Sequence, residues 1–363
     1  MTGCKIVLAA GGTGGHLFPA FALTEELKRR GAEVHIVTDE RVDGFLSNTV
    51  ADEMHVVPSA TVRGKNPVAL FKTGWTLLQG VRAARRLLKR LQPDVVLGFG
   101  GYPTFPPVLA AAQLGIATGL HDQNAVMGRA NRLLARRVDV IATSFGEVKH
   151  LPEALSDKVR LTGNPVRGAV LAVKDVPYPP LEDEFRVLIF GGSQGARFFS
   201  DFFPIALADM EPALAARLSV VQQCREEDLE RVEAVYQAVG IKTRCASFFD
   251  DLPELMSQSH LVICRSGAST VAELAVCGRP AIMVPLPHAL DNDQLLNARS
   301  LVNSGAGWVI TQENLTKLGF LEQFGQFFAQ PEDLQSAANA AKSLGQPDAA
   351  VRLADVVMEL ASS

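Results

Sequence analysis

The sequence is poor in cysteine, and its cysteines are not spaced for a metal cluster or a disulfide framework. There are five in 363 residues, and no two of them form a C-x-x-C pattern: Cys4, Cys224, Cys245, Cys264 and Cys277. An odd number of scattered thiols is typical of a protein from a reducing compartment. We therefore expect free cysteines in a cytoplasmic protein, most of them in the core.

A long apolar run is also lacking. A membrane-spanning helix needs about 18 or more apolar residues in succession, whereas the longest candidate, Pro106–Leu120, is interrupted by Gln113 and two glycines. This segment predicts a buried helix instead. The N-terminal residues lack the basic start and small-residue cleavage site of a signal peptide. We expect a soluble protein.

Two common nucleotide-binding motifs are incomplete in the first glycine-rich loop, Gly11–Gly15. Counting from Gly12, Leu17 occupies the third glycine position of G-x-G-x-x-G. Asp39 ends the second predicted strand and keeps NAD binding open as an alternative. No Gly-Lys-Ser/Thr follows the loop, so ATP or GTP hydrolysis is disfavoured. A convincing D-x-D pair is missing too, which favours metal-independent chemistry.

What the sequence does have is the length and alternation of a two-domain α/β protein. Domains run to roughly 100–200 residues, and short apolar runs alternate here with helical stretches throughout. Such alternation predicts parallel sheets covered by helices on both faces. The predicted strands are Lys5–Ala10, Val34–Thr38, Val95–Gly98, Val140–Thr143, Val187–Phe190, Ser219–Gln222, Leu261–Cys264 and Ala281–Val284.

The pattern restarts in the middle of the chain, after the proline- and acid-rich segment Lys174–Glu184. We predict a domain of residues 1–163 and another of residues 164–345. A last helix within residues 346–363 is expected to pack on one of them. Residues 1–163 hold 20 Lys and Arg against 14 Asp and Glu, a net charge of +6, and the rest of the chain carries −10. The first domain is therefore expected to meet an anionic partner, although a total of −4 argues against a nucleic-acid-binding protein.

Each predicted domain opens with a strand and a glycine loop, GGTGGH at Gly11–His16 and GGSQG at Gly191–Gly195. Glycines let backbone N–H groups approach phosphate oxygens, and the start of a helix favours an anion. The helix after the first loop is expected to begin near Leu17–Pro19. His16 could act there as a general base or be a solvent-facing residue at the helix start. A tight turn without a ligand is the alternative for either loop.

Three more polar segments follow predicted strands or apolar runs. In Ile263–Glu273, Ser266 or Ser269 could cap a helix whose N–H groups would suit a phosphate. His121–Asn124 (HDQN) is either a solvated turn or part of a site. Asp291, Gln294 and Asn297 stand three apart, so they are expected on one helix face that meets either water or a polar ligand.

The segment Asn66–Leu91 predicts an amphipathic helix with two distinct faces. Leu70, Leu77, Val81, Leu88 and Leu91 form the expected core stripe. Another face carries an apolar part followed by basic residues: Phe71, Trp75, Leu78, Arg82, Arg85, Arg86 and Lys89. This second face is typical of a helix that lies on anionic lipid. Packing under a loop, with the basic run merely solvated, is the alternative.

Taken in order, the motifs resemble one family. GGTGGH, GFGGYPT, HDQN, TGNPVR, GGSQGA, CRSGASTVAE and D-x-x-Q-x-x-NA are similar to those of the bacterial peptidoglycan N-acetylglucosaminyltransferases, the MurG type, over roughly Lys5–Val309. The resemblance implies a GT-B fold, in which two Rossmann-like domains face each other across a cleft. It also implies an inverting transferase that moves N-acetylglucosamine from UDP-GlcNAc to the 4-hydroxyl of lipid I (undecaprenyl-pyrophosphoryl-MurNAc-pentapeptide) and forms lipid II.

The resemblance implies roles for single residues. His16 would be the general base or would position the acceptor, and Asp122 is the rival candidate. Arg167 and Ser193 would contact the diphosphate, Phe249 the uracil through its backbone, Glu273 the ribose and Gln294 the sugar. The remaining substrate-binding residues would be Thr13, Gly14, Gly15, Asn124, Ala268, Ser269, Thr270, Val271 and Ala272.

Asp122 departs from the glutamate usual in the family, and Met127 and Arg129 replace the more usual proline and leucine. These departures affect the expected geometry of the acceptor site and not that of the donor site. The implied location is the cytoplasmic face of the inner membrane, as a peripheral protein without a cofactor, alongside other cell-wall synthesis proteins. The alternatives are a UDP-GlcNAc 2-epimerase, another GT-B glycolipid glycosyltransferase, or a nucleotide-sugar or NAD-binding module without chemistry.

Overall fold

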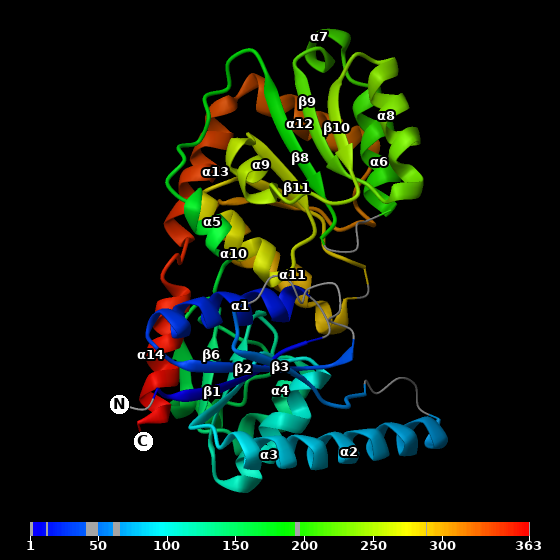
Figure 1. The fold of residues 1–363 in the computed structure, drawn as a ribbon. Coiled ribbons are helices and arrows are strands. Elements are labelled where there is room, and N and C mark those ends of the chain that lie inside the picture. The colour runs from blue at the N-terminus through cyan, green and yellow to red at the C-terminus, as the bar shows by residue number, and fades with distance from the viewer. Residues whose placement is uncertain are drawn as a thin grey trace. The chain divides into compact units, whose positions relative to one another are not determined.

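The computed structural model describes residues 3–11, 14–40, 50–60, 66–192, 197–287 and 289–362. The chain divides into two compact units, the first made of residues 1–167 and 347–363 and the second of residues 168–346. Each unit is a parallel β-sheet with helices on both faces (Figure 1).

The first unit is built on seven strands in the order β3-β2-β1-β4-β5-β6-β7, all parallel. Its strands are β1 Lys5–Ala9, β2 Glu33–Thr38, β3 Glu53–Val56, β4 Val95–Gly98, β5 Ala117–Asp122, β6 Val140–Thr143 and β7 Val159–Leu161. Its helices are α1 Gly14–Arg29, α2 Pro67–Leu91, α3 Phe105–Leu114, α4 Arg129–Leu134 and α14 Ala349–Ala361, with 3-10 turns η2 Tyr102–Thr104, η3 Ala135–Arg137 and η4 Glu153–Lys158.

Both faces of this sheet are buried, which explains why its central strands are continuous apolar runs. Ile6 and Leu8 of β1 pack with α1 and α14 on one face, and Val7 and Ala9 pack with α2 and α3 on the other. Successive side chains of a strand alternate between faces, so every second residue must suit each layer. The C-terminal helix α14 thus completes the first unit (Figure 1).

The second unit has six parallel strands in the order β10-β9-β8-β11-β12-β13. Its strands are β8 Phe185–Phe190, β9 Leu218–Gln223, β10 Lys242–Ala246, β11 Leu261–Cys264, β12 Ala281–Met283 and β13 Gly307–Val309. Its helices are α5 Gly168–Ala172, α6 Arg197–Ala208, α7 Pro212–Ala215, α8 Leu229–Ala238, α9 Leu252–Gln258, α10 Ala268–Cys277, α11 Asp293–Val302, α12 Lys317–Ala329 and α13 Pro331–Leu344, with 3-10 turns η5 Glu226–Asp228 and η6 Leu290–Asn292.

A cluster of phenylalanine rings fills one face of the second sheet. Phe185 of β8 meets Phe324 and Phe328, with ring centroids 5.3 and 4.8 Å apart, and Phe203 of α6 meets Phe320 at 5.3 Å. Tilted and edge-to-face pairs at such distances stabilise a core beyond the area that they bury. Aromatic packing therefore contributes to holding helices α6 and α12 on the sheet.

All eight strands predicted from the sequence are present, with ends that differ by at most two residues. The prediction that Pro106–Leu120 is one buried helix is wrong. Helix α3 ends at Leu114 because Gly115 takes a left-handed conformation (φ 72°) as its C-cap, and β5 begins at Ala117. Glycine adopts this conformation without steric cost, and it commonly ends helices.

Candidate active site

The loop predicted to bind phosphate leaves the carboxyl edge of the first sheet, between β1 and α1. The loops after β4 and β5 leave the same edge and contain Gly100–Gly101 and Gln123–Asn124. Open parallel sheets bind ligands at this edge, because several loops meet there. The candidate site of the first unit is therefore assembled from segments about 100 residues apart.

His16 lies in the first turn of α1, since the helix begins at Gly14 and not at Leu17–Pro19 as expected. Its ring is packed against two glycines with left-handed backbones, Gly100 (φ 88°) and Gly101 (φ 74°). A Cβ atom at either position would lie only 3.3 Å from a ring carbon of His16. Glycine is thus favoured at both positions, by the left-handed backbone and by the close approach of the imidazole.

A chain of hydrogen bonds runs from His16 into the core of the unit. Nδ1 of His16 lies 2.9 Å from Oε1 of Gln123, and Nε2 of Gln123 lies 3.0 Å from Nδ1 of His121. Nε2 of His121 lies 2.9 Å from the carbonyl oxygen of Gly163. Four residues from the ends or loops of α1, β5 and β7 are connected in this way.

The chemistry of these groups allows one arrangement of protons. The Gly163 carbonyl can only accept, so Nε2 of His121 donates to it. Complete burial lowers the pKa of His121 to about 4, so at neutral pH its Nδ1 carries no proton and accepts from the Gln123 amide. The amide oxygen then faces His16, whose Nδ1 donates to it. The lone pair of His16 is therefore on Nε2, the ring nitrogen that takes no part in this chain of hydrogen bonds.

Asp122, the rival base, anchors the loop that follows β5. It is 2 % exposed, and its Oδ2 accepts from the backbone N–H of Gly128 and the side-chain amide of Asn131, both at 2.9 Å. Its Oδ1 accepts from the N–H of Asn124 at 3.3 Å. Burial raises the pKa of Asp122, while these donors oppose the shift. The solvated-turn alternative for His121–Asn124 is wrong, because the first three of these residues are buried.

The start of α1 is suited to an anion. Gly14 and Gly15 begin the helix, where backbone N–H groups carry the positive end of the helix dipole. The guanidinium carbon of Arg167 lies 4.8 Å from the ring centroid of Phe18, one turn further along the helix. A cation is thereby held beside the first turn. Thr13, predicted to bind the donor, lies outside the described residues.

In the second unit, the predicted phosphate site lies at the start of α10. Gly267 is the N-cap residue of this helix, so the prediction that Ser266 or Ser269 caps it is wrong. Ser266 is completely buried just before the helix, and its Oγ has no hydrogen-bond partner among the described residues. The substrate-binding residues predicted here, Ala268, Ser269, Thr270, Val271 and Ala272, form the first turns of α10. Ser193, predicted on the preceding glycine loop, lies outside the described residues.

Arg265, just before α10, holds the neighbouring loops together by hydrogen bonds. This role was not predicted. Its guanidinium donates to the carbonyls of Val284 and Pro285, both at 3.0 Å, and to Oε1 of Gln312 at 2.9 Å. It also lies 4.7 Å from the ring centroid of Phe199. These bonds tie the ends of β11 and β12 together beneath α10. The only available signal was its place in the motif CRSGASTVAE.

Glu273 and Gln294 are both placed by well-packed helices. Glu273 lies in the second turn of α10 and is 4 % exposed. Oε1 of Gln294 accepts from the N–H of Leu286 at 2.9 Å, and Asn297 donates to the Ser266 carbonyl at 3.2 Å. The expected single face with Asp291 is wrong, because Asp291 precedes α11 with a left-handed backbone (φ 55°).

Phe249 is held by stacking. Its ring is 6 % exposed, and the guanidinium of Arg244 lies 5.0 Å from its centroid while also bonding both carboxylate oxygens of Asp251 at 2.8 and 3.2 Å. The side chain of Phe249 is therefore buried against Arg244. The predicted contact of Phe249 with a ligand, which is through the backbone, does not involve this side chain.

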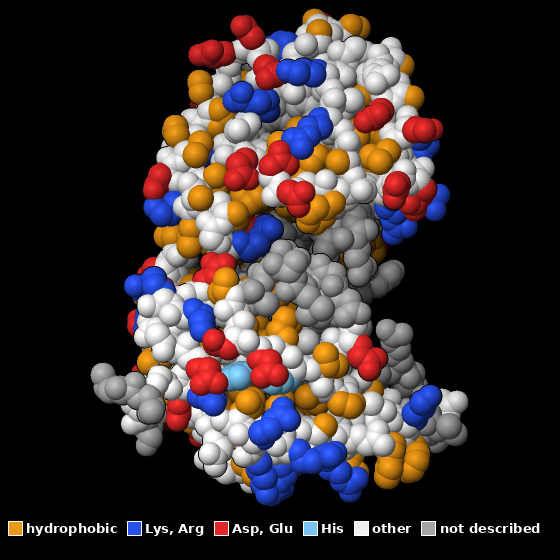
Figure 2. Space-filling view, viewed as in Figure 1, with side chains coloured by type: hydrophobic (Ala, Val, Ile, Leu, Met, Phe, Trp, Pro, Cys, Tyr) orange, Lys and Arg blue, Asp and Glu red, His pale blue; other side chains and the backbone are white. Residues whose placement is uncertain are grey.

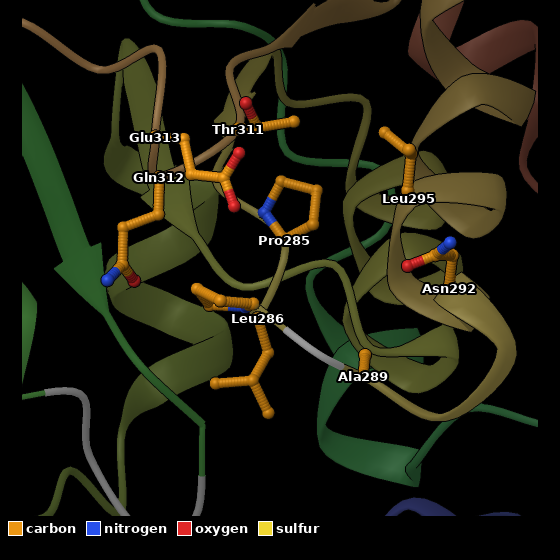
Figure 3. Close-up of a pocket in the computed structure, with 9 residues that line it drawn as sticks. Pro285, Leu286, Ala289, Asn292, Leu295, Thr311, Gln312 and Glu313 are labelled. Atoms are coloured by element: carbon orange, nitrogen blue, oxygen red, sulfur yellow. The ribbon is translucent and has the colours of Figure 1, made fainter.

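A cavity of about 230 Å³ lies in the same unit between the loop after β12 and the loop after β13 (Figure 3). Its labelled lining residues are Pro285, Leu286, Ala289, Asn292, Leu295, Thr311, Gln312 and Glu313. Figure 3 shows the carboxylate of Glu313 turned toward Pro285, with Asn292 and Leu295 on the opposite wall. The cavity adjoins the segment that carries Gln294, since Leu286 contacts both.

Comparison with known proteins identifies the family of this chain. Residues 6–143 match the glycosyltransferase family 28 N-terminal domain, and residues 186–353 match the glycosyltransferase family 28 C-terminal domain. A protein from Rhizobium etli named UDP-N-acetylglucosamine--N-acetylmuramyl-(pentapeptide) pyrophosphoryl-undecaprenol N-acetylglucosamine transferase is 51% identical over 362 residues. The match covers 98% of this chain and 96% of that protein. The chain belongs to the MurG family of glycosyltransferases.

Solved structures share the fold of this chain, and one of them belongs to the same family. MurG of Acinetobacter baumannii is 28% identical, with a TM-score of 0.80 over 98% of this chain and 99% of that one. A UDP-GlcNAc 2-epimerase of Neisseria meningitidis bound to UDP-GlcNAc has a TM-score of 0.67 at 17% identity, covering 98% of this chain and 100% of that one. At that identity the second likeness shows a shared fold alone.

In this MurG family member, helix α2 presents an exposed apolar group beside a basic one. Phe71, Trp75 and Leu78 are 75 %, 51 % and 42 % exposed, and Arg82 and Arg86 follow on the same helix face.

The opposite face of α2 packs on the sheet through Ala84, Leu87 and Leu88. Of the predicted core stripe, Leu88 is buried as expected, and Leu77, Val81 and Leu91 are half-buried. The side chain of Leu70 is not described. Figure 2 shows basic side chains gathered along the edge formed by α2, with apolar ones toward one end. Among the described residues, no helix is long and apolar enough to cross a bilayer.

Proposed function

We propose that this chain transfers N-acetylglucosamine from UDP-GlcNAc to undecaprenyl-pyrophosphoryl-MurNAc-pentapeptide, forming lipid II. The observation that carries the proposal is the match over 98% of the chain to transferases named for this reaction. A match of this length includes both family 28 domains, so it covers the parts that would bind both substrates. UDP-GlcNAc and lipid I are thus the substrates of the proposed reaction.

His16 is the general base of the proposed reaction. The 4-hydroxyl oxygen of the muramyl residue attacks C1 of N-acetylglucosamine from the side opposite UDP, which inverts that carbon. As the new C–O bond forms, the bond from C1 to UDP breaks, and its electron pair leaves with the diphosphate. The hydroxyl proton passes to Nε2 of His16, and the Gln123 amide oxygen stabilises the resulting imidazolium through Nδ1. Asp122 supports the reaction indirectly by fixing the loop of Gln123 and Asn124.

Within the second unit, the leaving diphosphate is stabilised by backbone N–H groups at the start of α10, those of Ala268 and Ser269. Within the first unit, the guanidinium of Arg167 lies beside the start of α1. The family resemblance assigns Arg167, Thr13 and Ser193 to the diphosphate as well. Asn124 and Gln294 bind the donor sugar, Glu273 the ribose, and the backbone at Phe249 the uracil.

An acceptor-dependent assay tests the proposed function. Incubation with labelled UDP-GlcNAc and a short-chain lipid I analogue is expected to yield one labelled disaccharide-lipid for each UDP released, and no sugar product without the acceptor. An epimer that forms from UDP-GlcNAc alone would contradict the transferase and support the epimerase alternative. Release of free N-acetylglucosamine at the same rate with and without acceptor would contradict transfer as well.

We further propose that α2 binds the cytoplasmic leaflet, where the lipid substrate is presented. The helix carries six basic residues and no acidic one, and its exposed apolar side chains stand on the same face. Apolar contact with the acyl boundary and attraction to anionic headgroups would act together, each basic residue adding about 1 kcal/mol near such a surface. The protein would then be peripheral and would meet other cell-wall synthesis proteins at the membrane.

The double substitution Trp75→Ala with Arg82→Glu is expected to weaken binding to anionic vesicles by roughly tenfold or more. Cosedimentation with vesicles of phosphatidylglycerol and phosphatidylethanolamine measures the effect. Leu318→Ala with Arg225→Glu is the matched control, because it removes an exposed apolar side chain and reverses an exposed charge in the second unit. Equal losses in both variants, or no binding by the wild type, would contradict a role for α2.

A further inference from the structure

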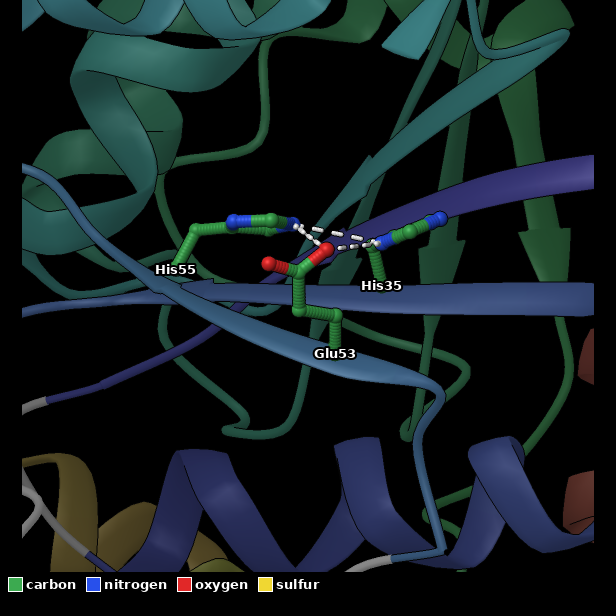
Figure 4. Close-up of side chains that lie close together, drawn as sticks. All are labelled: His35, Glu53 and His55. Atoms are coloured by element: carbon green, nitrogen blue, oxygen red, sulfur yellow. Dashed lines mark hydrogen bonds and ion pairs between the residues drawn. The ribbon is translucent and has the colours of Figure 1, made fainter.

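His35, Glu53 and His55 come together on one face of the first sheet, away from the loops of the active site. Strand β2 pairs with the edge strand β3 so that His35 is opposite Glu53 and Val37 is opposite His55. Residues two apart on a strand share a face, so all three polar side chains lie on the face where Val37 packs. Figure 4 shows both imidazole rings directed toward the carboxylate of Glu53. We propose that this cluster is a binding site for a divalent transition-metal ion, with Zn²⁺ as the best fit.

The distances between the three ligand atoms fit one ion. Nδ1 of His35 lies 3.2 Å from Nε2 of His55, and Oε2 of Glu53 lies 3.9 and 3.7 Å from these two nitrogens. The point equidistant from the three atoms is about 2.1 Å from each, within the roughly 2.0–2.2 Å at which zinc binds imidazole nitrogen and carboxylate oxygen. An ion fits between the three groups without moving the backbone of either strand.

A second carboxylate sets the first imidazole in the orientation that a metal needs. Nε2 of His35 lies 2.8 Å from Oε1 of Glu33, and Lys5 lies 3.1 Å from the same oxygen. Nε2 therefore carries the proton and donates it to Glu33, which leaves the lone pair of His35 on Nδ1, toward the cluster. Histidines that bind metals are commonly held by a carboxylate in this way.

Burial and ligand type narrow the choice of ion. The two imidazoles are 5 % and 8 % exposed in their side chains, whereas Glu53 is 60 % exposed. Two nitrogens and one oxygen suit zinc and its neighbours in the transition series better than magnesium or calcium, which prefer oxygen ligands alone. The exposed side of Glu53 is the entry path, and a water molecule would complete a tetrahedral set.

The consequence of binding is structural. The cluster joins β3, which is only four residues long and forms the edge of the sheet, to β2. Between their side chains, His35 and His55 are linked by the hydrogen bond between the two imidazoles. An ion that binds the folded chain more tightly than the unfolded chain shifts the equilibrium toward folding.

The test uses the full-length chain after treatment with a chelator. Calorimetric titration of the wild type with ZnCl₂ is expected to show one tightly bound equivalent. The melting temperature of the zinc-saturated protein is expected to be about 5 °C or more above that of the chelator-treated protein. Co²⁺ is expected to give the visible absorption of a tetrahedral nitrogen–oxygen site. Glu53→Gln is expected to weaken binding by roughly tenfold or more and His55→Gln to abolish it.

Glu153→Gln is the matched control, since it neutralises an exposed carboxylate of the same unit. Glu53 is exposed, so its variant is expected to fold, and far-UV circular dichroism checks this for both substitutions. A wild type that takes up no zinc would overturn the proposal. If Glu53→Gln and His55→Gln both bind zinc with the wild-type affinity, the ion lies elsewhere and the proposal is equally overturned.

Discussion

Replacement of His16 by Asn is expected to lower the rate of N-acetylglucosamine transfer by roughly 10²–10⁴-fold, the usual contribution of a general base. Asn keeps a polar group that can reach Gln123 but has no atom that can accept a proton near neutral pH. The loss should fall on kcat, because the base accepts its proton in the transition state and not when the substrates bind. Leu17 and Leu23, which pack α1 on the sheet, are unchanged in this variant. Steady-state rates with the lipid I analogue measure the effect.

His150→Asn is the matched control for this change. His150 is exposed in the same unit and has a left-handed backbone (φ 66°) that Asn tolerates. UDP affinity, measured by calorimetry, is expected to be the same in the wild type and both variants. Unchanged turnover in His16→Asn would exclude His16 as base and as acceptor-positioning residue, and would make Asp122 the next candidate.

The strands that were predicted and those that were missed differ in their place in the sheets. Four of the strands that were not predicted are short or polar, and they form the edges of the two sheets: β3, β7, β10 and β13. An edge strand pairs on one side only and faces solvent, so its sequence need not be a continuous apolar run. KTRCA in β10 and EMHV in β3 therefore lack the pattern that revealed the central strands.

The fifth missed strand, β5, is central, and the reason there is different. Its sequence ATGLHD contains Gly119 and ends in two polar residues. Gly119 packs closely against Leu97, 2.7 Å from where a Cβ would be, and His121 and Asp122 are buried because they belong to the hydrogen-bond network of the site. Close packing at Gly119 and buried hydrogen bonds at His121 and Asp122 therefore replace the apolar pattern by which a strand is predicted. Candidate sites are common places for such a failure.

The residues and the reaction of the candidate site were predicted from the sequence, but the hydrogen-bond network around His16 was not. His16 and Gln123 are 107 residues apart, and His121 and Gly163 are 42 apart, so their bonds follow from strand order and not from spacing. The motifs named segments that meet at the carboxyl edge of the first sheet. The neutral state of His121, which the hydrogen-bond chain requires, follows from its burial and could not be read from a motif. The metal cluster was missed for the same reason as β3, since only the pairing of β2 with β3 unites its ligands.

Replacement of Glu273 by Gln is expected to raise KM for UDP-GlcNAc by roughly 10- to 100-fold while kcat changes little. In the proposed complex the carboxylate accepts hydrogen bonds from both ribose hydroxyls, and a bond to a charged group contributes about 1.5–3 kcal/mol. Gln has nearly the same shape but has one neutral acceptor and an NH₂ group in its place. The ribose is remote from the reacting carbon, so the loss falls on binding.

Three measurements separate this role from a merely structural one. Glu273 is 4 % exposed in α10, so the melting temperature of Glu273→Gln shows whether the helix is disturbed. Glu254→Gln, an exposed carboxylate on α9 in the same unit, is the matched control and is expected to keep the wild-type KM. Binding of uracil alone should survive in Glu273→Gln, because the proposed uracil contact is the backbone at Phe249. A variant that melts as the wild type does and binds UDP-GlcNAc with wild-type affinity would show that the ribose is held by another residue.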